Sequence, residues 1–322
     1  MDTSLSLISP AKLNLFLHIN GRRPADQPFA GYHELQSVFQ LLDRGDVLHF
    51  TLQNKPGFTL SPDFPEIPLQ SNLIYRAAEA LKKHVSTPKK LPGVHIELEK
   101  NLPMGGGVGG GSSNAATTLL ALNYLWGLHL TEDKLAEIGA SLGADVPIFV
   151  RGKSAWAEGI GDILTPIRLP EYWFVVLCPE CHINTAKIFS NERLTRDTPK
   201  KKIAPALEGQ TTKQHNSQKI AYQDQTDSKV SSDDFLSDSY HNDCQALVTE
   251  LYPEVGKTLE FLNQFSTSRL TGTGACCFAR FTDEAQAKQV LNEARSKFKG
   301  FIAKGVNLSP AILRLAEADR SQ

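Results

Sequence analysis

The sequence lacks any long apolar run. None of its 322 residues belongs to a stretch approaching the roughly 18 apolar residues that a membrane span needs. The first residues, Met-Asp-Thr-Ser, form neither the basic start nor the apolar core of a secretory signal. We therefore expect a cytoplasmic protein with no membrane partner.

An excess of charge of either sign is also absent. Lys and Arg together number 34 and Asp and Glu number 35, which gives a formal net charge of −1. A protein that binds nucleic acid usually carries a basic surface, because phosphate contacts supply most of the affinity. We expect no nucleic-acid partner, and any anion site has to be local.

Cysteine is scarce, and its five copies are an odd number that argues against a disulfide scaffold. Cys178 and Cys181 have C-x-x-C spacing, but a zinc ribbon needs a second such pair, and Cys276 and Cys277 are adjacent. A redox pair stays open. We favour reduced cysteines at the end of the apolar strand 173–177, and we predict no metal-ligand set in the protein.

Glycine, by contrast, is dense between residues 103 and 116, where six copies precede Ser112, Ser113 and Asn114. Glycine permits positive φ and close backbone approach, so successive N–H groups can converge on one anion. Apolar residues from Ala115 to Trp126 then recur at helical spacing, which a flexible linker would lack. The segment predicts an anion-binding turn that opens a helix.

Two common phosphate loops do not fit this turn. A P-loop requires a lysine after its last glycine, and none follows here. A dinucleotide fingerprint requires an acidic residue about 20 positions further on. Glu132 and Asp133 lie near that distance, but they follow Thr131 as an acidic helix start, and capping explains them more simply.

The rest of the chain alternates strand and helix patterns without a repeat, which predicts an α+β protein of two domains, 1–165 and 166–322. A polar stretch at about 198–242 is predicted to be a disordered insert. Strands are predicted at 5–20, with one face buried, at 38–52, with a turn at 43–46, and at 94–98, 155–157, 163–164, 173–178 and 276–281. Phe149 is predicted to lie in a further core strand. Helices are predicted after Asn72 and Thr131 and at 243–251, 253–265 and 287–298.

Two charged residues stand out against their surroundings. Lys12 is the only cation among the first 20 residues, and Asp145 lies in a tight turn between Gly143 and Pro147. A lysine at a strand edge can simply prevent edge pairing, and a turn aspartate can simply bond its own backbone. The residues alone leave both interpretations open.

Three segments together resemble the motifs of the GHMP small-molecule kinases, which include galactokinase, homoserine kinase and mevalonate kinase. They are 9–15 (Ser-Pro-Ala-Lys-Leu-Asn-Leu), 103–116, and 270–275 (Leu-Thr-Gly-Thr-Gly-Ala). Segments 31–33, 143–147 and 303–309 also resemble a bacterial branch of the family that phosphorylates a cytidine diphosphate-linked alcohol. The resemblance covers nearly the whole chain; the insert at 198–242 is longer than is usual in the family.

The resemblance implies a two-domain GHMP kinase fold. In it, a ribosomal-protein-like βαβ ATP-binding domain and a ferredoxin-like α/β domain flank the active-site cleft. It implies transfer of the γ-phosphoryl group of ATP, with Mg²⁺, to a hydroxyl of a cytidine diphosphate-linked methylerythritol, by a monomer or weak homodimer. Another kinase of the superfamily, a binding module and a nucleotide-dependent oxidoreductase are the alternatives.

The same resemblance assigns site residues. Asp145 is implied as the base, with Lys12 beside it. Because the transition state of phosphoryl transfer is loose, Asp145 could instead act mainly by positioning the hydroxyl, and the sequence leaves both roles open. Phe189 could equally be a core residue, and Gly272–Ala275 a hairpin turn. The residues implied to bind ATP are Asn72, Lys100, Pro103, Met104, Gly105, Gly106, Gly107, Val108, Gly109, Gly110, Gly111, Ser112, Ser113 and Asn114. Those implied to bind the acceptor are Asn14, Tyr32, His33, Asp145, Thr185, Phe189, Thr271, Gly272, Thr273 and Gly274.

Overall fold

The structure is a computed structural model that describes residues 3–26, 29–85, 91–202 and 234–320. The strands are β1 (Ser4–Arg22), β2 (His33–Gln53), β3 (Phe58–Ser61), β4 (Gly93–Glu99), β5 (Ala155–Glu158), β6 (Ile163–Pro166), β7 (Trp173–Cys178), β8 (Ser268–Leu270), β9 (Cys277–Phe281) and β10 (Lys299–Val306). The α-helices are α1 (Leu73–Lys82), α2 (Gly110–Leu125), α3 (Glu132–Ala140), α4 (Val146–Arg151), α5 (Thr185–Ser190), α7 (Gln245–Leu251), α8 (Pro253–Asn263), α9 (Glu284–Ala294) and α10 (Pro310–Arg320).

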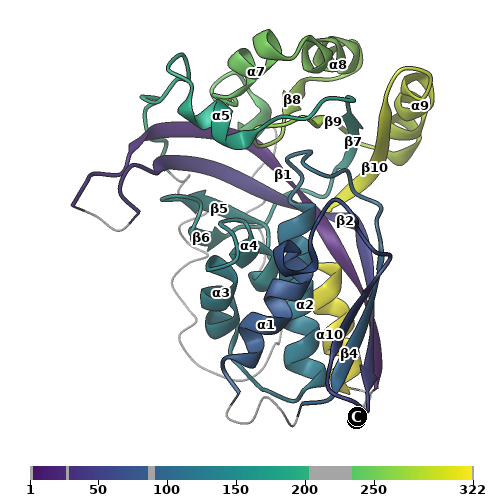
Figure 1. The fold of residues 1–322 in the computed structure, drawn as a ribbon. Coiled ribbons are helices and arrows are strands. Elements are labelled where there is room, and N and C mark those ends of the chain that lie inside the picture. Colours follow the sequence, from purple (N-terminus) through teal and green to yellow (C-terminus); the bar gives the residue numbers. More distant parts are fainter. Residues whose placement is uncertain (1–2, 27–28, 86–90, 203–233, 321–322) are drawn as a thin grey trace.

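One mixed sheet connects the two halves of the chain. Its main path is β3-β4-β2-β10-β7-β9-β8, with β1 and β5 also paired to β2. Among the strands that the structure describes, only β3 and β4 run parallel, whereas the long β1–β2 ladder and the other strand pairs are antiparallel. Figure 1 shows β1 and β2 running from the part of the molecule that holds α1, α2 and α10 toward the part that holds α5, α7 and α8.

The predicted turn at 43–46 is wrong, because β2 continues through it with a bulge. Pro10 pairs with Gly45 and Lys12 pairs with Leu41, so three residues of β2 lie opposite one residue of β1. A bulge of this kind bends a strand and turns its side chains. The N–H of Lys12 is released from the ladder and donates to the carbonyl of Val108 (2.9 Å), in the glycine-rich segment.

The first strand also differs from its prediction of one buried face. Burial alternates from Ser4 to Ile8, but from Ser9 to Ile19 both faces are buried. The reason is that Leu17 and Ile19 pack in a second hydrophobic cluster, formed with β7, β9, α7, α8 and α9. Tertiary packing on both sides replaces the half-exposed strand that the sequence pattern suggests.

Helices α1, α2 and α10 share the first hydrophobic cluster with β1, β2 and β4. Helix α10 has no counterpart in the prediction, although Ala311 and Ala318 are buried in this cluster with residues of the N-terminal half. Phe149, predicted to lie in a strand, belongs to α4 instead. Within the described ranges, no helix is both long and apolar enough to cross a membrane.

The two described ends of the predicted insert are packed rather than disordered. The N–H of Thr198 donates to Ile19 (3.1 Å) and its hydroxyl donates to Asp243 (2.8 Å). Phe235 is buried, and its carbonyl accepts from Arg269 (2.6 Å). The predicted boundaries at 198 and 242 are therefore too wide, because these polar ends have partners in the fold. Residues 203–233 lie outside the described part of the chain.

His18 is fully buried beside these ends. Its ring lies 4.8 Å from that of Phe16 and stacks at 6.0 Å on Tyr240, and its Nε2 accepts the N–H of His241 (3.2 Å). Burial, followed by the nearby charges of His241, Lys201 and Arg269, lowers the pKa of His18 to about 4. The unfolded chain takes up this proton near pH 6.5, whereas the folded chain does not take it up until about pH 4.

We predict that stability falls as the pH drops from about 6.5 toward 4, and that His18→Gln removes part of this loss, on the order of 1–3 kcal/mol. Above about pH 6.5 the ring is neutral in the folded and the unfolded chain, so it does not make the free energy of unfolding depend on pH. Urea unfolding of both proteins at about pH 7.5 and 5 measures the difference. An equal loss in the two proteins would contradict the prediction.

Candidate active site

A cleft of about 1200 Å³ lies between the two halves of the molecule, and most residues that the sequence analysis selected line it. These are Lys12, Asn14, Tyr32, His33, Asn72, Lys100, Pro103, Met104, Gly105, Gly106, Gly107, Gly109, Gly110, Gly111, Ser112, Asn114, Asp145, Thr185, Phe189, Gly272, Thr273 and Gly274. The fold thus collects at one place segments that are far apart in the sequence.

The two charged residues singled out earlier meet in this cleft. Nζ of Lys12 lies 3.5 Å from Oδ2 of Asp145, and the lysine side chain is only 4% exposed. The ammonium also donates to Oδ1 of Asn14 and lies 5.2 Å from the centre of the Phe39 ring. A buried ammonium requires such partners. Lys12 is therefore not a solvent-facing edge lysine.

Asp145 is the residue at the start of α4, yet its side chain makes no capping bond to that helix. Pro147 stands in the first turn of α4, where its missing N–H costs nothing. The carboxylate is about one-third exposed to the cleft, and its ion pair is with Lys12. The sequence allows Asp145 to be a turn residue that bonds its own backbone. The structure shows instead that its side chain pairs with Lys12.

The glycine-rich segment ends in a tight junction that requires glycine. Gly109, with φ of +76°, is the N-cap of α2. A Cβ there would lie 2.7 Å from the Phe149 ring and 3.2 Å from Cγ of Lys12. The N-terminal end of α2 therefore lies directly beside Lys12, and its free N–H groups and helix dipole favour an anion at this point of the cleft.

The second glycine loop packs against the first. A Cβ on Gly107 would lie 2.3 Å from the carbonyl oxygen of Thr271, and the N–H of Cys276 donates to the carbonyl of Gly106 (3.1 Å). The same loop connects β8 to its antiparallel partner β9. Both interpretations of Gly272–Ala275 are therefore confirmed: the segment is a hairpin connection, and its glycines permit close approach to the cleft.

Three selected residues lie behind the cleft wall rather than on it. Val108 is in a hydrophobic cluster, the hydroxyl of Ser113 accepts from Ser9 (2.8 Å), and the hydroxyl of Thr271 accepts the N–H of Asn14 (3.0 Å). Their side chains connect the three sequence motifs to one another. The helical start at Gly110 turns the Ser113 side chain inward, away from any ligand in the cleft.

Asp46, which the sequence analysis treated only as part of a turn, organises the base of the glycine loop. Its carboxylate is completely buried and accepts from Lys100 Nζ (2.7 Å), from Asn114 Nδ2 (2.9 Å) and from the N–H groups of Asn101 and Leu102 (both 2.8 Å). Lys100 and Asn114, both selected as ATP-binding residues, are thereby tied to one buried anion. The structure gives their side chains a positioning role.

The opposite end of the cleft is aromatic. The Phe189 ring lies 5.1 Å from that of His33; it is partly buried and packs against the second hydrophobic cluster. Tyr32 is 58% exposed. Burial, then Arg22, then Arg196, lowers the pKa of His33, so the ring is neutral near pH 7.

Polar side chains surround these rings. The hydroxyls of Thr185 and Thr273, which both line the cleft, lie 2.8 Å apart and join α5 to the second glycine loop. Arg22, His182 and Asn184 also line the cleft. They lie outside the recognisable motifs, so the sequence offers no signal for them.

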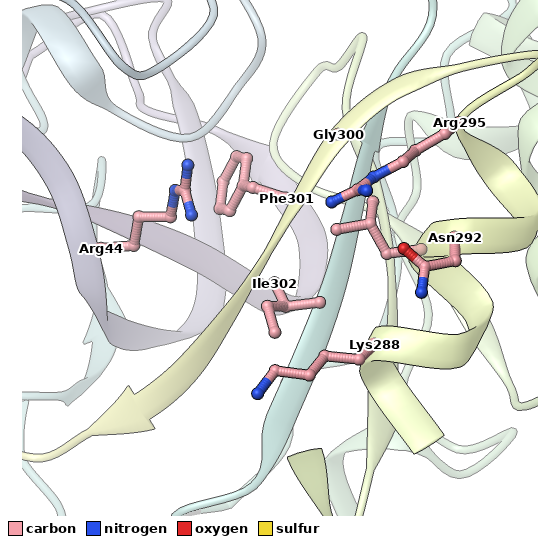
Figure 2. Close-up of a pocket in the computed structure, with 8 residues that line it drawn as sticks. Arg44, Lys288, Asn292, Arg295, Gly300, Phe301 and Ile302 are labelled. Atoms are coloured by element: carbon pink, nitrogen blue, oxygen red, sulfur yellow. The ribbon is translucent and has the colours of Figure 1, made fainter. Parts of the chain in front are cut away.

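A smaller cavity of about 330 Å³ lies beside β10 and α9. Figure 2 shows Arg44 next to Phe301 on one side of the β10 ribbon and Asn292 and Arg295 on the other. The Arg44 guanidinium lies over the Phe301 ring (5.3 Å), and Lys288 is paired with Glu284 (2.9 Å). These cations do not converge on one point, so the larger cleft is the candidate site.

Cys178 and Cys181, which have C-x-x-C spacing in the sequence, do not form a disulfide in the structure. Sγ of Cys178 lies nearest to Sγ of Cys276 (2.8 Å), and all five cysteines are free. The hydrogen bond with the Cys178 thiol, followed by burial, raises the pKa of Cys276 well above its usual value. Among the described residues, no three His, Cys, Asp or Glu side chains are grouped so as to hold a metal ion.

Comparison with known proteins identifies the family. The model of the GHMP kinase N-terminal domain matches residues 72–153, and that of the GHMP kinase C-terminal domain matches residues 232–300. A 4-diphosphocytidyl-2-C-methyl-D-erythritol kinase of Marinobacter nauticus is 54% identical over 318 residues, which cover 98% of this chain and 99% of that protein. The chain belongs to the GHMP kinase family.

Further relatives agree with this GHMP kinase assignment. The protein of the same name from Hahella chejuensis is 50% identical over 98% of both chains. A crystal structure of 4-(cytidine 5′-diphospho)-2C-methyl-D-erythritol kinase matches with a TM-score of 0.73 at 25% identity, covering 94% of this chain and all of that chain. Mevalonate kinase of Methanococcus jannaschii, at 15% identity and a TM-score of 0.63, shares the fold. The protein is an ATP-dependent kinase with the α+β architecture of the family.

Substitution of Asp46 tests its role in this kinase. We predict that Asp46→Asn destabilises the fold by about 3 kcal/mol, because it leaves Lys100 without its buried partner. We also predict that it raises KM for ATP roughly tenfold, a change of about 1.4 kcal/mol, with a smaller effect on KM for the acceptor. Urea unfolding and steady-state kinetics measure both changes.

Asp43→Asn is the matched control, since Asp43 is exposed and its carboxylate accepts a single N–H, that of Lys304 (2.8 Å). Both variants exchange a carboxylate for an amide in β2, Asp43 within the bulge and Asp46 in the regular ladder just beyond it. A normal KM for ATP in a folded Asp46→Asn protein would remove Asp46 from the organisation of the site.

Proposed function

We propose that this kinase transfers the γ-phosphoryl group of ATP to the 2-hydroxyl of 4-diphosphocytidyl-2-C-methyl-D-erythritol, giving the 2-phosphate and ADP, in non-mevalonate isoprenoid precursor biosynthesis. The observation that carries the proposal is the Lys12–Asp145 pair. It lies beside the N-terminal end of α2, in a cleft whose other end holds Tyr32, His33 and Phe189. The names of the relatives at 54% and 50% identity support the same acceptor.

The donor phosphates are assigned to the glycine-rich segment. Gly105, Gly107 and Gly109 have positive φ, which lets consecutive N–H groups turn toward one anion. The N-terminal end of α2 adds its dipole, and both groups of donors are fixed before ATP arrives. Phosphoryl transfer has a loose transition state, so positioned donors provide much of the catalysis.

The acceptor hydroxyl is assigned to Asp145. Its carboxylate accepts the hydroxyl proton and orients the oxygen toward the γ-phosphorus. Lys12 stabilises the ionised carboxylate at 3.5 Å and holds Asn14 through a hydrogen bond. The new bond forms between the acceptor oxygen and phosphorus as the bond to the ADP oxygen breaks. The proton passes to Asp145.

The cytidine portion is assigned to the aromatic end of the cleft. Tyr32 and Phe189 offer flat apolar faces to a base, and His33 offers a polar edge. Hydrogen bonds that a competitor cannot make give strong discrimination, because the buried polar groups are then left unpaired. Thr185 is on α5, as Phe189 is, and its hydroxyl lies 2.8 Å from that of Thr273 in the second glycine loop.

Magnesium is expected with ATP, and the donor set fits an ion that is held mainly through phosphate. Asp145 and Ser112 supply a carboxylate and a hydroxyl at the cleft, and Mg²⁺ often takes only one or two protein ligands beside phosphates and water. Bound there, the ion would neutralise phosphate charge. We also propose that the protein is cytoplasmic, that its domains are 1–165 and 166–322, and that it is a monomer or weak homodimer.

The acceptor is tested with a small panel of alcohols. ATP turnover is expected with the cytidyl compound and not with mevalonate, homoserine or methylerythritol 4-phosphate, because the last three lack the base that the aromatic end would hold. Phe189→Ala should raise KM for the cytidyl compound roughly tenfold and leave KM for ATP unchanged. Turnover of mevalonate or homoserine in place of the cytidyl compound would overturn the substrate.

Asp145→Asn tests the reacting end. We predict a loss of kcat of about 10²–10⁴-fold in a protein that still folds, since general base catalysis typically supplies that factor. The unfolding midpoint should also fall, because Lys12 loses its anionic partner. Asp133→Asn is the control, because the Asp133 carboxylate is 84% exposed and pairs with Arg151 (3.0 Å) on the surface. A near-normal rate in the Asp145 variant would remove this residue from the chemistry.

A further inference from the structure

We propose that Arg196 is a positioning residue that sets the base specificity of the cleft. It fixes the neutral ring of His33 with its proton on Nδ1, so that the ring presents a hydrogen-bond donor to the base. The inference rests on the proposed function, because it concerns how the cytidine end of that substrate is read. Arg196 itself does not line the cleft and acts through His33.

The hydrogen bond between the two side chains has only one possible direction. Nε of Arg196 lies 3.0 Å from Nε2 of His33. A guanidinium group has donors and no acceptor, and it stays charged in proteins. Nε2 must therefore be the acceptor and carries no proton, so the proton of the neutral ring is on Nδ1. Within the described part of the chain, Nδ1 of His33 has no hydrogen-bond partner of its own.

Arg196 is held in place independently of any ligand. Its two terminal nitrogens donate to main-chain carbonyls at the end of α5 and in the turn that follows. The acceptors are the carbonyl oxygens of Phe189 (3.0 Å), Asn191 (2.6 Å), Leu194 (3.0 Å) and Glu192 (3.4 Å). With its donors engaged in this way, the guanidinium cannot turn away from His33 without losing several charge-assisted bonds.

The same guanidinium links the two rings at the aromatic end. It donates to the carbonyl of Phe189 and to the ring of His33, and these two rings lie 5.1 Å apart. Burial of the ring, then the positive charges of Arg22 and Arg196, lower the pKa of His33, so the ring is neutral near pH 7. A doubly protonated ring is thereby disfavoured, and a single tautomer remains.

An Nδ1–H donor distinguishes between pyrimidines. Position 3 of cytosine is an unprotonated nitrogen that accepts a hydrogen bond, whereas position 3 of uracil is an N–H that donates one. A fixed donor facing that edge favours cytosine and leaves two opposed donors with uracil. A ring free to exchange tautomers would accommodate either base. Arg196 thus converts an adaptable histidine into a selective one.

The test combines a spectroscopic and a kinetic measurement. Two-dimensional ¹H–¹⁵N NMR of the histidine rings reports which nitrogen is protonated, and the His33 signals are identified by their loss in His33→Asn. We expect a protonated Nδ1 and an unprotonated Nε2 in the unaltered chain near pH 7.5. Mixed tautomers are expected in Arg196→Met, and the original pattern in Arg196→Lys, which keeps a donor. A protonated Nε2 in the unaltered chain would overturn the inference.

Kinetics then connect the tautomer to specificity. We expect Arg196→Met to lower the ratio of kcat/KM for the cytidyl compound over its uridyl analogue at least tenfold, with KM for ATP unchanged. The side-chain amide of His33→Asn offers an N–H close to the place of Nδ1. On that background Arg196→Met should have little further effect on the ratio.

Failure of this inference can be distinguished from failure of the proposed function. An equal loss of selectivity on both backgrounds would mean that Arg196 only supports the fold, and it would overturn the inference. Failure of the unaltered chain to use the cytidyl compound would instead refute the proposed function. The NMR measurement needs no substrate, so it still decides the tautomer in that case.

Discussion

The site depends on a buried ammonium group. Lys12 is almost fully enclosed, and an enclosed cation is stable only where an anion, a polar acceptor or an aromatic face lies within reach. Asp145, Asn14 and Phe39 supply these partners. These partners belong to different segments. The buried Lys12 ammonium is therefore stable only when β1, β2 and the start of α4 lie close together. The glycine at position 109 lets the end of α2 approach the same point.

Much of this arrangement can be predicted from the sequence where it depends on local rules. The glycine-rich segment, the Asn72 and Thr131 caps and the apolar spacing of α2 are determined by neighbouring residues, and the structure contains them as expected. The motifs near Lys12 and Asp145 also point to the cleft, because the family resemblance relates segments that the pattern alone does not connect.

Features that arise from tertiary contacts were not predictable. The bulge in β2 looks like a turn in the sequence, since Gly45 and Asp46 suit either structure, and only the pairing with β1 distinguishes them. Helix α10 has apolar residues at helical spacing (Ala311, Leu315 and Ala318), but only the fold shows that it packs on the N-terminal cluster. Asp46 and Arg196 have no motif at all. Their roles come from partners, Lys100 and His33, that the fold brings to them.

The position of α10 has a consequence for the order in which the molecule is built. This helix follows every other described element in the chain, yet it packs on β1 and α2 and helps to enclose the core of the N-terminal half. Contacts between distant segments form late, because closing a long loop costs entropy before the contact stabilises anything. During synthesis the core of the N-terminal half therefore cannot be completed until α10 has emerged from the ribosome, and until then part of that core has to stay open.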